Sequence, residues 1–230
     1  MIQTVRAILF DFDGLLLDTE HPEFLSWHEV FAEHGCTLAP ETWASHTGKG
    51  AGAIPFSPYE ALEQALGRKI DRDAVRTARR RRFAELMELE TLQPGAEARL
   101  AEARRLGMKV AIVSSSPRNW ITGYLAKFGL ADAFDAILCA DDVAHTKPDP
   151  ELYLAALTKL GVRAGEAIAF EDSANGIAAA KQAGIFCVAV PNPLTRHSCL
   201  SRADVILGSL AEITLRGLLT TYAMNNVPSA

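Results

Sequence analysis

Short apolar segments rich in branched residues recur along the chain, and several of them end abruptly in acidic, glycine or serine residues. These runs do not alternate apolar with polar residues, which is typical of parallel strands buried on both faces of a sheet. The predicted strands are Val5–Phe10, Lys109–Ser114, Ala136–Ala140, Ala167–Phe170, Phe186–Val190 and Asp204–Leu207.

Stretches of helical length and amphipathic spacing lie between most of these strands. They are Pro117–Phe128, Pro150–Leu160 and Ala174–Ala183. Gly129, Gly161 and Gly184 follow them, at the position that glycine favours after a helix. The repeated order of strand, helix and glycine predicts an α/β fold with a doubly wound parallel sheet. The binding crevice of such a sheet lies outside the carboxyl ends of its strands.

Residues 18–91 break this rhythm, because they contain helical patterns but no buried strand. The patterns cover Pro22–His34, Ser57–Leu66 and Asp71–Glu90. The α/β alternation resumes after Leu92–Gly95, a segment that carries Pro and Gly. We therefore expect a smaller all-helical cap domain, residues 18–91, inserted after the first strand of an α/β core formed by residues 1–17 and 92–230.

Composition excludes several classes of protein. A net charge of −5 and a pI of about 5.7 would repel a polyanion, so nucleic-acid binding is not expected. No apolar run approaches the roughly 18 residues of a membrane span. Four widely spaced cysteines without a secretory leader predict reduced thiols and a cytoplasmic location; they are Cys36, Cys139, Cys187 and Cys199. We expect a monomer or a weak homo-oligomer.

Two pairs of acids directly follow predicted strands. Asp11 and Asp13 follow the first strand, and alternation places both on the same side of the chain. Glu171 and Asp172 follow the fourth strand. Either pair alone also suits an ordinary strand exit or helix start. Together they predict four acids at one sheet edge. At about 4 Å, each like-charged pair costs on the order of 4 kcal/mol, so the cluster requires a cation or protonation, and a Mg²⁺ site is the simpler explanation.

Hydroxyl groups and a lysine occupy neighbouring predicted loops. Ser114, Ser115 and Ser116 end the second strand before a proline, where hydroxyls and free backbone N–H groups suit an anion. A plain helix cap is the alternative. Lys147 lies between Thr146 and Pro148, and the neighbouring prolines would stiffen its approach to the same crevice. A lone Lys-Pro usually marks a surface loop, so Lys147 indicates a site only in combination with the acids and serines at the other strand ends.

The segments DFDGLLLDT, VSSS, TKPDPELY and FEDSANGI resemble, in this order, the four motifs of the haloacid dehalogenase superfamily. The resemblance spans nearly the whole core. A helical insert after the first motif resembles the C1 cap of the β-phosphoglucomutase-like, CbbY-like phosphatase branch.

This resemblance implies a role for each acid. Asp11 would be the nucleophile that forms an aspartyl-phosphate, and Asp13 would protonate the leaving oxygen and then activate water. Mg²⁺ would be held by Asp11, by Asp172 and by the main-chain carbonyl of Asp13. Glu171 would contact the ion directly or through one of its ligands.

The resemblance also implies the phosphate contacts. Ser114 and Lys147 would hold the transferring phosphoryl group, whose reaction depends mainly on positioning and charge stabilisation. Ser115, Ser116 and Arg118 are candidate substrate contacts, and Arg118 is placed to reach a second phosphate.

Two features of the insert have simpler interpretations. The glycine-rich segment 48–52 lacks the Gly-Lys-Ser/Thr ending of a nucleotide loop and follows no strand. The resemblance instead implies a cap loop facing the core, with Lys49 as a substrate contact. Arg79–Arg82 form a basic run beside Glu85 and Glu88, which we interpret as a solvated face of a cap helix. The six histidines do not have the spacing of metal ligands, and we assign none of them a catalytic role.

These observations predict a Mg²⁺-dependent phosphatase acting on a small phosphorylated metabolite, such as a sugar phosphate. The alternative is a phosphomutase of the β-phosphoglucomutase type. Such mutases resemble this chain but carry a cap-helix histidine and a cap-loop arginine where Glu23 and Ala51 stand here. A dehalogenase is less favoured, because its members typically lack an acid at the position of Asp13. A phospho-accepting receiver domain has no place for the helical insert.

Overall fold

A six-stranded parallel sheet forms the core of the computed structural model, which describes residues 4–44, 56–196 and 200–225. The strand order is β3-β2-β1-β4-β5-β6. The strands are β1 (Ala7–Phe10), β2 (Lys109–Val113), β3 (Ala136–Leu138), β4 (Ala167–Glu171), β5 (Phe186–Ala189) and β6 (Val205–Ile206). The predicted doubly wound α/β fold is confirmed. Most strands are shorter than predicted, whereas β4 extends one residue further and includes Glu171.

The strand order reverses at β1, which pairs with β2 on one side and β4 on the other. Phe10 is in register with Ile112 and Phe170, and the rings of Phe10 and Phe170 stack with their centroids 5.3 Å apart. The residues after this level therefore leave the sheet side by side. Such a switch point is where an open α/β sheet forms its binding crevice.

The two faces of the sheet carry side chains of different size. Ile8, Phe10 and their large neighbours face α5 (Ala96–Arg105), α6 (Arg118–Lys127) and α9 (Leu215–Asn225). The opposite face is lined largely by alanines of β1, β2 and β4, which allows α7 (Glu151–Leu160) and α8 (Ala174–Gln182) to pack closely. Strand alternation thus separates two hydrophobic clusters. No range was predicted for α5 or α9.

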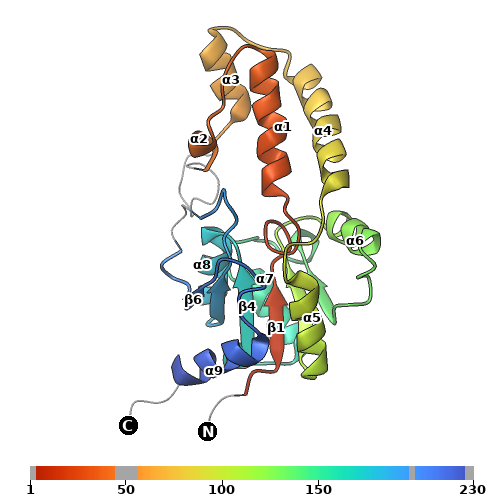
Figure 1. The fold of residues 1–230 in the computed structure, drawn as a ribbon, viewed down its shortest axis with the longest axis vertical. Coiled ribbons are helices and arrows are strands. Elements are labelled where there is room, and N and C mark those ends of the chain that lie inside the picture. Colours follow the sequence, from red (N-terminus) through yellow and green to blue (C-terminus); the bar gives the residue numbers. More distant parts are fainter. Residues whose placement is uncertain (1–3, 45–55, 197–199, 226–230) are drawn as a thin grey trace.

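The described part of the insert contains helices joined by loops and no strand, as predicted. It consists of α1 (Glu20–Glu33), α2 (Pro40–Ala44), α3 (Pro58–Leu66) and α4 (Arg72–Leu89), which stand beyond the carboxyl edge of the sheet (Figure 1). Ser57 and Asp71 cap α3 and α4 by accepting backbone N–H bonds. The short helix α2 was not predicted.

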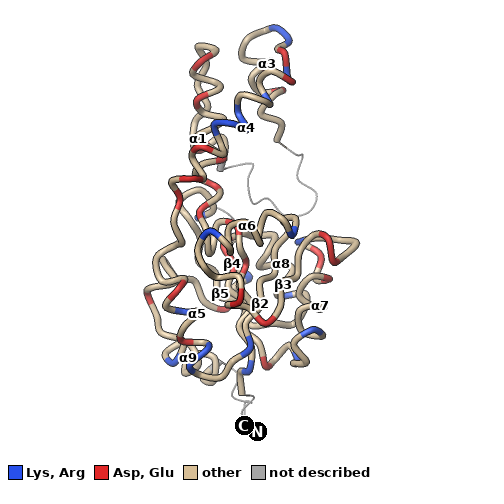
Figure 2. The backbone as a smooth tube through the Cα atoms, turned by 90° about the vertical axis from the view of Figure 1, so that its right-hand side faces the viewer, with Lys and Arg blue, Asp and Glu red and all other residues tan. Residues whose placement is uncertain are grey.

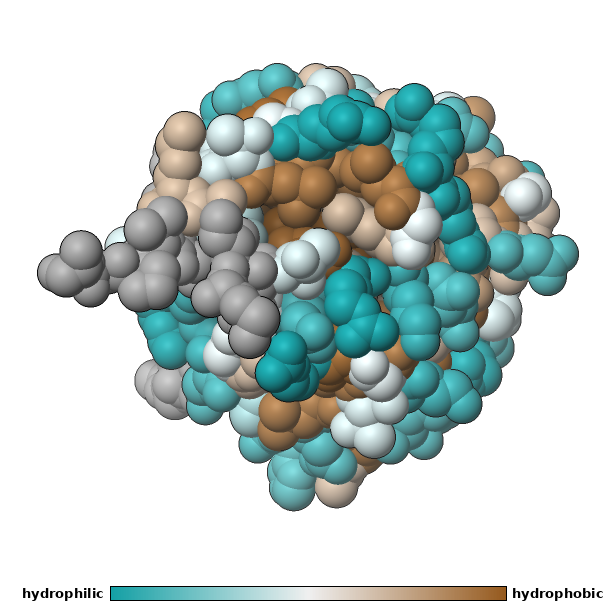
Figure 3. Space-filling model, turned by 90° about the horizontal axis from the view of Figure 1, so that it is seen from below, coloured by the Kyte–Doolittle hydropathy of each residue, from teal (hydrophilic) through white to brown (hydrophobic). Residues whose placement is uncertain are grey.

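The two connections between insert and core run beside each other. Leu17 and Leu92 form an antiparallel bridge, and the N–H of Gln93 donates to the carbonyl of Leu16 at 2.9 Å. The predicted boundaries at 17/18 and 91/92 therefore fall at one place in space. The far end of the molecule, at the amino ends of the strands, has a mixed polar and apolar surface (Figure 3). None of the described helices has the length and apolarity required to cross a membrane.

The prediction of a solvated face at Arg79–Arg82 is wrong for Arg79, whose side chain is 13% exposed, whereas the side chain of Arg82 is 41% exposed although it is paired. The guanidinium of Arg79 lies 5.2 Å from the ring centroid of Trp27, and its Nη1 is 2.7 Å from a carboxylate oxygen of Glu23. Arg82 binds both oxygens of Glu29, at 2.7 and 3.0 Å. Basic positions of α4 thus lie close to acidic positions of α1 (Figure 2). Residues three apart share a helix face, so these two arginines turn towards α1, whereas Arg80 and Arg81 remain exposed.

We expect Arg79→Ala to lower the free energy of unfolding by about 1–3 kcal/mol, because it removes a largely buried ion pair and a stack on an indole ring. Arg80→Ala is the matched control, since Arg80 is exposed, and a change within about 0.5 kcal/mol is expected. Urea unfolding measures both. Equal effects of the two substitutions would contradict the buried role of Arg79.

Candidate active site

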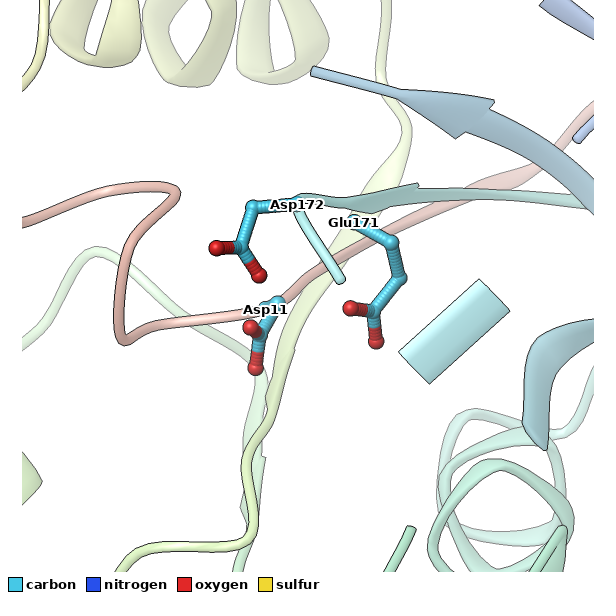
Figure 4. Close-up of side chains that lie close together, drawn as sticks. All are labelled: Asp11, Glu171 and Asp172. Atoms are coloured by element: carbon cyan, nitrogen blue, oxygen red, sulfur yellow. The ribbon is translucent and has the colours of Figure 1, made fainter. Parts of the chain in front are cut away.

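Three buried carboxylates meet at the carboxyl edge of β1 and β4. Asp11, Glu171 and Asp172 each present an oxygen, and these oxygens all lie within 4.8 Å of one another. Figure 4 shows the three side chains leaving adjacent chain segments towards one space. The parallel pairing of β1 with β4 produces this arrangement, because Phe10 and Phe170 are in register and the acids follow them.

Burial of these carboxylates has a marked electrostatic cost. Burial and the nearby charge of Glu171 raise the pKa of Asp11 to about 8. Burial, followed by the charges of Asp11 and Glu171, raises the pKa of Asp172 well above its usual range. Desolvation and like charge both disfavour the ionised form. The cluster therefore requires positive charge to remain ionised at neutral pH.

Lys147 supplies part of that charge. Its Nζ lies 2.7 Å from Asp11 Oδ1 and 2.7 Å from Glu171 Oε1, and it donates to the carbonyl of Val113 at 2.6 Å. Its side chain is only 6% exposed. Burial alone would lower the pKa of Lys147, but the two carboxylates raise it above its ordinary value. The lysine is therefore a fixed cation inside the site, and the structure brings it to the place that the sequence predicted.

Glu171 is held by residues that sequence reasoning did not assign. The hydroxyl of Tyr153 donates to Oε1 of Glu171, beside Lys147. A Cβ atom on Gly176 would lie 1.8 Å from Oε2 of Glu171, so only glycine fits there. Within the described ranges, Oε2 is buried without a hydrogen-bond partner. Tyr153 and Gly176 both lie in the quoted motif segments, but no spacing rule marks them as supports.

Asp172 has its own support from a distant loop. Asn192 donates from Nδ2 to Oδ2 of Asp172 at 3.0 Å, and its Oδ1 accepts the backbone N–H groups of Leu194 and Thr195. Gly14 has φ +78°, and a Cβ atom there would lie 2.2 Å from Oδ2 of Asp172. Sequence reasoning missed Asn192, for which the only signal was its place shortly after a predicted strand.

The carboxylate of Asp13 does not join the other three acids, so the expectation of four meeting acids is wrong. Its Oδ2 accepts the hydroxyls of Ser114 at 3.1 Å and Ser116 at 2.6 Å. Its Oδ1 accepts the indole N–H of Trp120 at 2.8 Å. Three neutral donors satisfy this charge, which removes the need for a cation beside it. Trp120 was not predicted as a site residue.

One further acid stands near Asp13. Glu20 begins α1, directly after the first motif, and it is half-buried. Burial, followed by the charges of Asp13, Glu23 and Asp18, raises the pKa of Glu20 to about 7. The cap thus places a carboxyl group close to the site, which the motif analysis did not single out.

The other predicted substrate contacts, Ser115, Arg118 and Lys49, are not shown beside the three clustered carboxylates. Ser115 is exposed. The Nη2 atom of Arg118 binds the two carboxylate oxygens of Asp142 at 2.7 and 2.6 Å, and its backbone N–H donates to Asp141. A phosphate contact from Arg118 would require that ion pair to open. Lys49 lies outside the described residues.

The donor set fits a hard divalent cation. The three clustered acids offer only oxygen ligands, and one buried carboxylate oxygen of Glu171 lacks a partner among the described residues. Mg²⁺ prefers such oxygens and commonly takes one or two carboxylates. Asp11 and Asp172 are the residues that would hold it, with Glu171 beside them. The described cysteines are all free thiols and lie outside this group.

The fold and this site together define an α/β enzyme with carboxylates and a lysine at the switch point of its sheet. Residues 5–184 match the haloacid dehalogenase-like hydrolase family, and the chain belongs to that family. The resemblance seen in the four motifs is thereby confirmed.

Similar proteins extend over nearly the whole chain. YhcW of Bacillus subtilis (strain 168) is 46% identical over 215 residues, covering 94% of this chain and 96% of that protein. Hexitol phosphatase B of Escherichia coli (strain K12) is 30% identical and covers 94% and 97% of the two chains. A crystal structure of CbbY from Rhodobacter sphaeroides, an Asp-to-Asn mutant in complex with xylulose-(1,5)bisphosphate, has a TM-score of 0.71 at 32% identity, covering 94% of this chain and 99% of that one.

Proposed function

We propose that this protein is a Mg²⁺-dependent phosphatase that hydrolyses a small phosphorylated metabolite, such as a sugar phosphate, through an aspartyl-phosphate on Asp11. The observation that carries the proposal is the buried contact of Asp11 with Lys147 inside a group of three carboxylates. A nucleophilic carboxylate requires a cationic setting to receive a dianionic phosphoryl group. An ion pair that only stabilises the fold would not need two further carboxylates, those of Glu171 and Asp172, beside it.

Each residue of the site has a place in this reaction. Asp11 attacks phosphorus, and Lys147 and the hydroxyl of Ser114 stabilise charge on the phosphoryl oxygens. Asp13 gives a proton to the departing oxygen and later takes one from the attacking water. A bound Mg²⁺ would neutralise charge on the phosphate and on the carboxylates. Asn192 holds Asp172 in place for that ion, and Gly14 leaves room for the carboxylate of Asp172.

The choice of a sugar phosphate rests on the relatives. One similar enzyme is named for hexitol phosphates, and one similar structure holds a sugar bisphosphate. Lys49, Ser115, Ser116 and Arg118 are the proposed substrate contacts.

Cap movement is the proposed route of substrate entry. The bridged linkers at Leu17 and Leu92 provide a hinge between the cap, residues 18–91, and the core. A cytoplasmic location and a monomeric or weakly associated state stay predictions.

The proposal is tested by phosphate release from a panel of phosphorylated sugars and polyols. Removing divalent cations with a chelator should abolish release, and added Mg²⁺ should restore it, because three buried carboxylates would otherwise repel the substrate. Full activity after chelation and dialysis would contradict the metal site.

The same panel separates the phosphatase from the phosphomutase. With β-glucose 1-phosphate and its bisphosphate, we expect inorganic phosphate or no reaction. Glu23, which stands where the mutase has a histidine, is paired with Arg79 inside the cap. Formation of glucose 6-phosphate without matching phosphate release would favour the mutase.

A further inference from the structure

The indole of Trp120 contacts both the proposed acid and the cap. Its N–H donates to Oδ1 of Asp13 at 2.8 Å, while Oδ2 is bound by the hydroxyls of Ser114 and Ser116. Ser114 and Ser116 belong to the second motif, whereas Trp120 lies beyond it, in the first turn of α6. One oxygen of Asp13 is thus oriented by a residue that no motif assigns.

The ring of Trp120 packs on the cap. It stacks on Phe83 of α4, with centroids 5.9 Å apart and an interplanar angle of 14°. It also makes an edge contact with Tyr124, at 4.8 Å. One turn further along α4, the carbonyls of Met87 and Glu88 accept bonds from Nζ of Lys127, on α6. The end of α4 is therefore bound to α6, and the indole of Trp120 packs directly against this cap helix.

Trp120 also faces a space large enough for a ligand. An open cavity of about 960 Å³ lies between α4 and α6, and its walls include Ser116, Trp120, Asn119, Tyr124 and Arg80. Two of the three donors to Asp13 line this space.

We propose that Trp120 is a positioning residue that holds Asp13 in the orientation for protonating the leaving oxygen, and that its stack on Phe83 makes this orientation depend on the seating of the cap. The inference rests on the proposed phosphatase function. In the step concerned, an oxygen of Asp11 bonds to phosphorus as the bond from phosphorus to the alcohol oxygen breaks. The proton of Asp13 passes to that departing oxygen. A general acid acts only within hydrogen-bond reach, so a carboxyl group that turns away loses its effect.

The test compares leaving groups. A sugar alkoxide is too basic to leave without a proton, whereas p-nitrophenolate leaves readily without one. Trp120→Phe keeps a ring against Phe83 but removes the indole N–H. We expect kcat/KM for a hexitol monophosphate to fall by about tenfold or more and kcat/KM for p-nitrophenyl phosphate by less than about threefold. Phe83→Leu retains the indole N–H of Trp120 but removes the stacked ring. We expect kcat/KM for the hexitol ester to fall more than kcat/KM for p-nitrophenyl phosphate in this variant too, but by a smaller factor.

Trp27→Phe is the control, because Trp27 is a cap tryptophan that contacts Arg79 and Tyr59. Its ratio of the two kcat/KM values should equal that of the unaltered enzyme. Equal losses for both esters in Trp120→Phe, or an unchanged ratio in Phe83→Leu, would overturn the inference and leave the phosphatase standing. If the hexitol ester is not hydrolysed, the sugar ester of the panel that is hydrolysed fastest takes its place. If the unaltered enzyme hydrolyses no ester of the panel, the proposed function fails, and the role of Trp120 fails with it. Thermal melting shows that each variant is folded, and Phe83→Leu supplies the test if Trp120→Phe does not fold.

Discussion

Asp11→Asn is expected to reduce phosphate release by about a thousandfold or more, because an amide does not attack phosphorus. The substitution also removes the negative charge that Lys147 contacts at 2.7 Å. It keeps nearly the same volume in a site where Asp11 is 7% exposed. The fold should therefore be preserved.

The stability of this variant gives a second, independent readout. Burial and Glu171 raise the pKa of Asp11 to about 8, so its ionised form is disfavoured in the folded protein. A neutral asparagine removes that cost, and the melting temperature without metal should stay equal or rise. Asp132→Asn, on the exposed surface, is the control and should retain full activity. More than a few percent of the original activity in Asp11→Asn would exclude Asp11 as the nucleophile.

Lys147→Met is expected to lower kcat by about a hundredfold or more, because it removes the buried cation that faces the phosphoryl group. It should also destabilise the protein, since breaking a buried ion pair leaves uncompensated charge and typically costs about 3–5 kcal/mol. Asp11 and Glu171 would both lose their contact with Nζ. Phosphate release and thermal melting measure the two effects.

Added Mg²⁺ should recover part of the lost stability of this variant but little of its activity. The ion can neutralise the carboxylates, whereas it cannot replace the ammonium group at its own position between Asp11 and Glu171. Lys159→Met, at an exposed position of α7, is the matched control and should change neither quantity. An unchanged melting temperature and rate in Lys147→Met would show that this lysine is not part of the working site.

The strands of the core and three of its helices, α6, α7 and α8, were predictable from the sequence alone, whereas α5 and α9 were not predicted. Parallel strands buried on both faces require continuous apolar runs, and a strand end is where polar residues can first appear. Ala167–Glu171 and the acid beyond it satisfy both conditions, as do Ala7–Phe10 and Asp11. Because carboxyl ends of parallel strands share an edge, the meeting of Asp11 with Glu171 and Asp172 followed from local patterns. The approach of Lys147 was predictable only together with these acids.

The supporting side chains were decided by the tertiary structure. Asp13 is separated from Ser116 by 103 residues and from Trp120 by 107, and no local period relates them. The carboxylate turned to these donors because they satisfy its charge without a cation. Asn192 reaches Asp172 from a loop 20 residues away for the same reason, namely that a buried carboxylate needs a donor wherever the fold brings one near.

For the arginines of α4, too, the tertiary structure decided which partners the side chains meet. The sequence led us to interpret Arg79–Arg82 as a solvated face of a cap helix, because local spacing does not show which element packs against that helix. Packing against α1 placed Glu23, Glu29 and Trp27 opposite Arg79 and Arg82, so that both arginines are paired and the side chain of Arg79 is largely buried. The sequence by itself thus determined the strands, the helices other than α2, α5 and α9, and the acids at the strand ends, because these depend on local periodicity. Only the tertiary structure decided which distant donor meets which acid, because that depends on how separate elements pack.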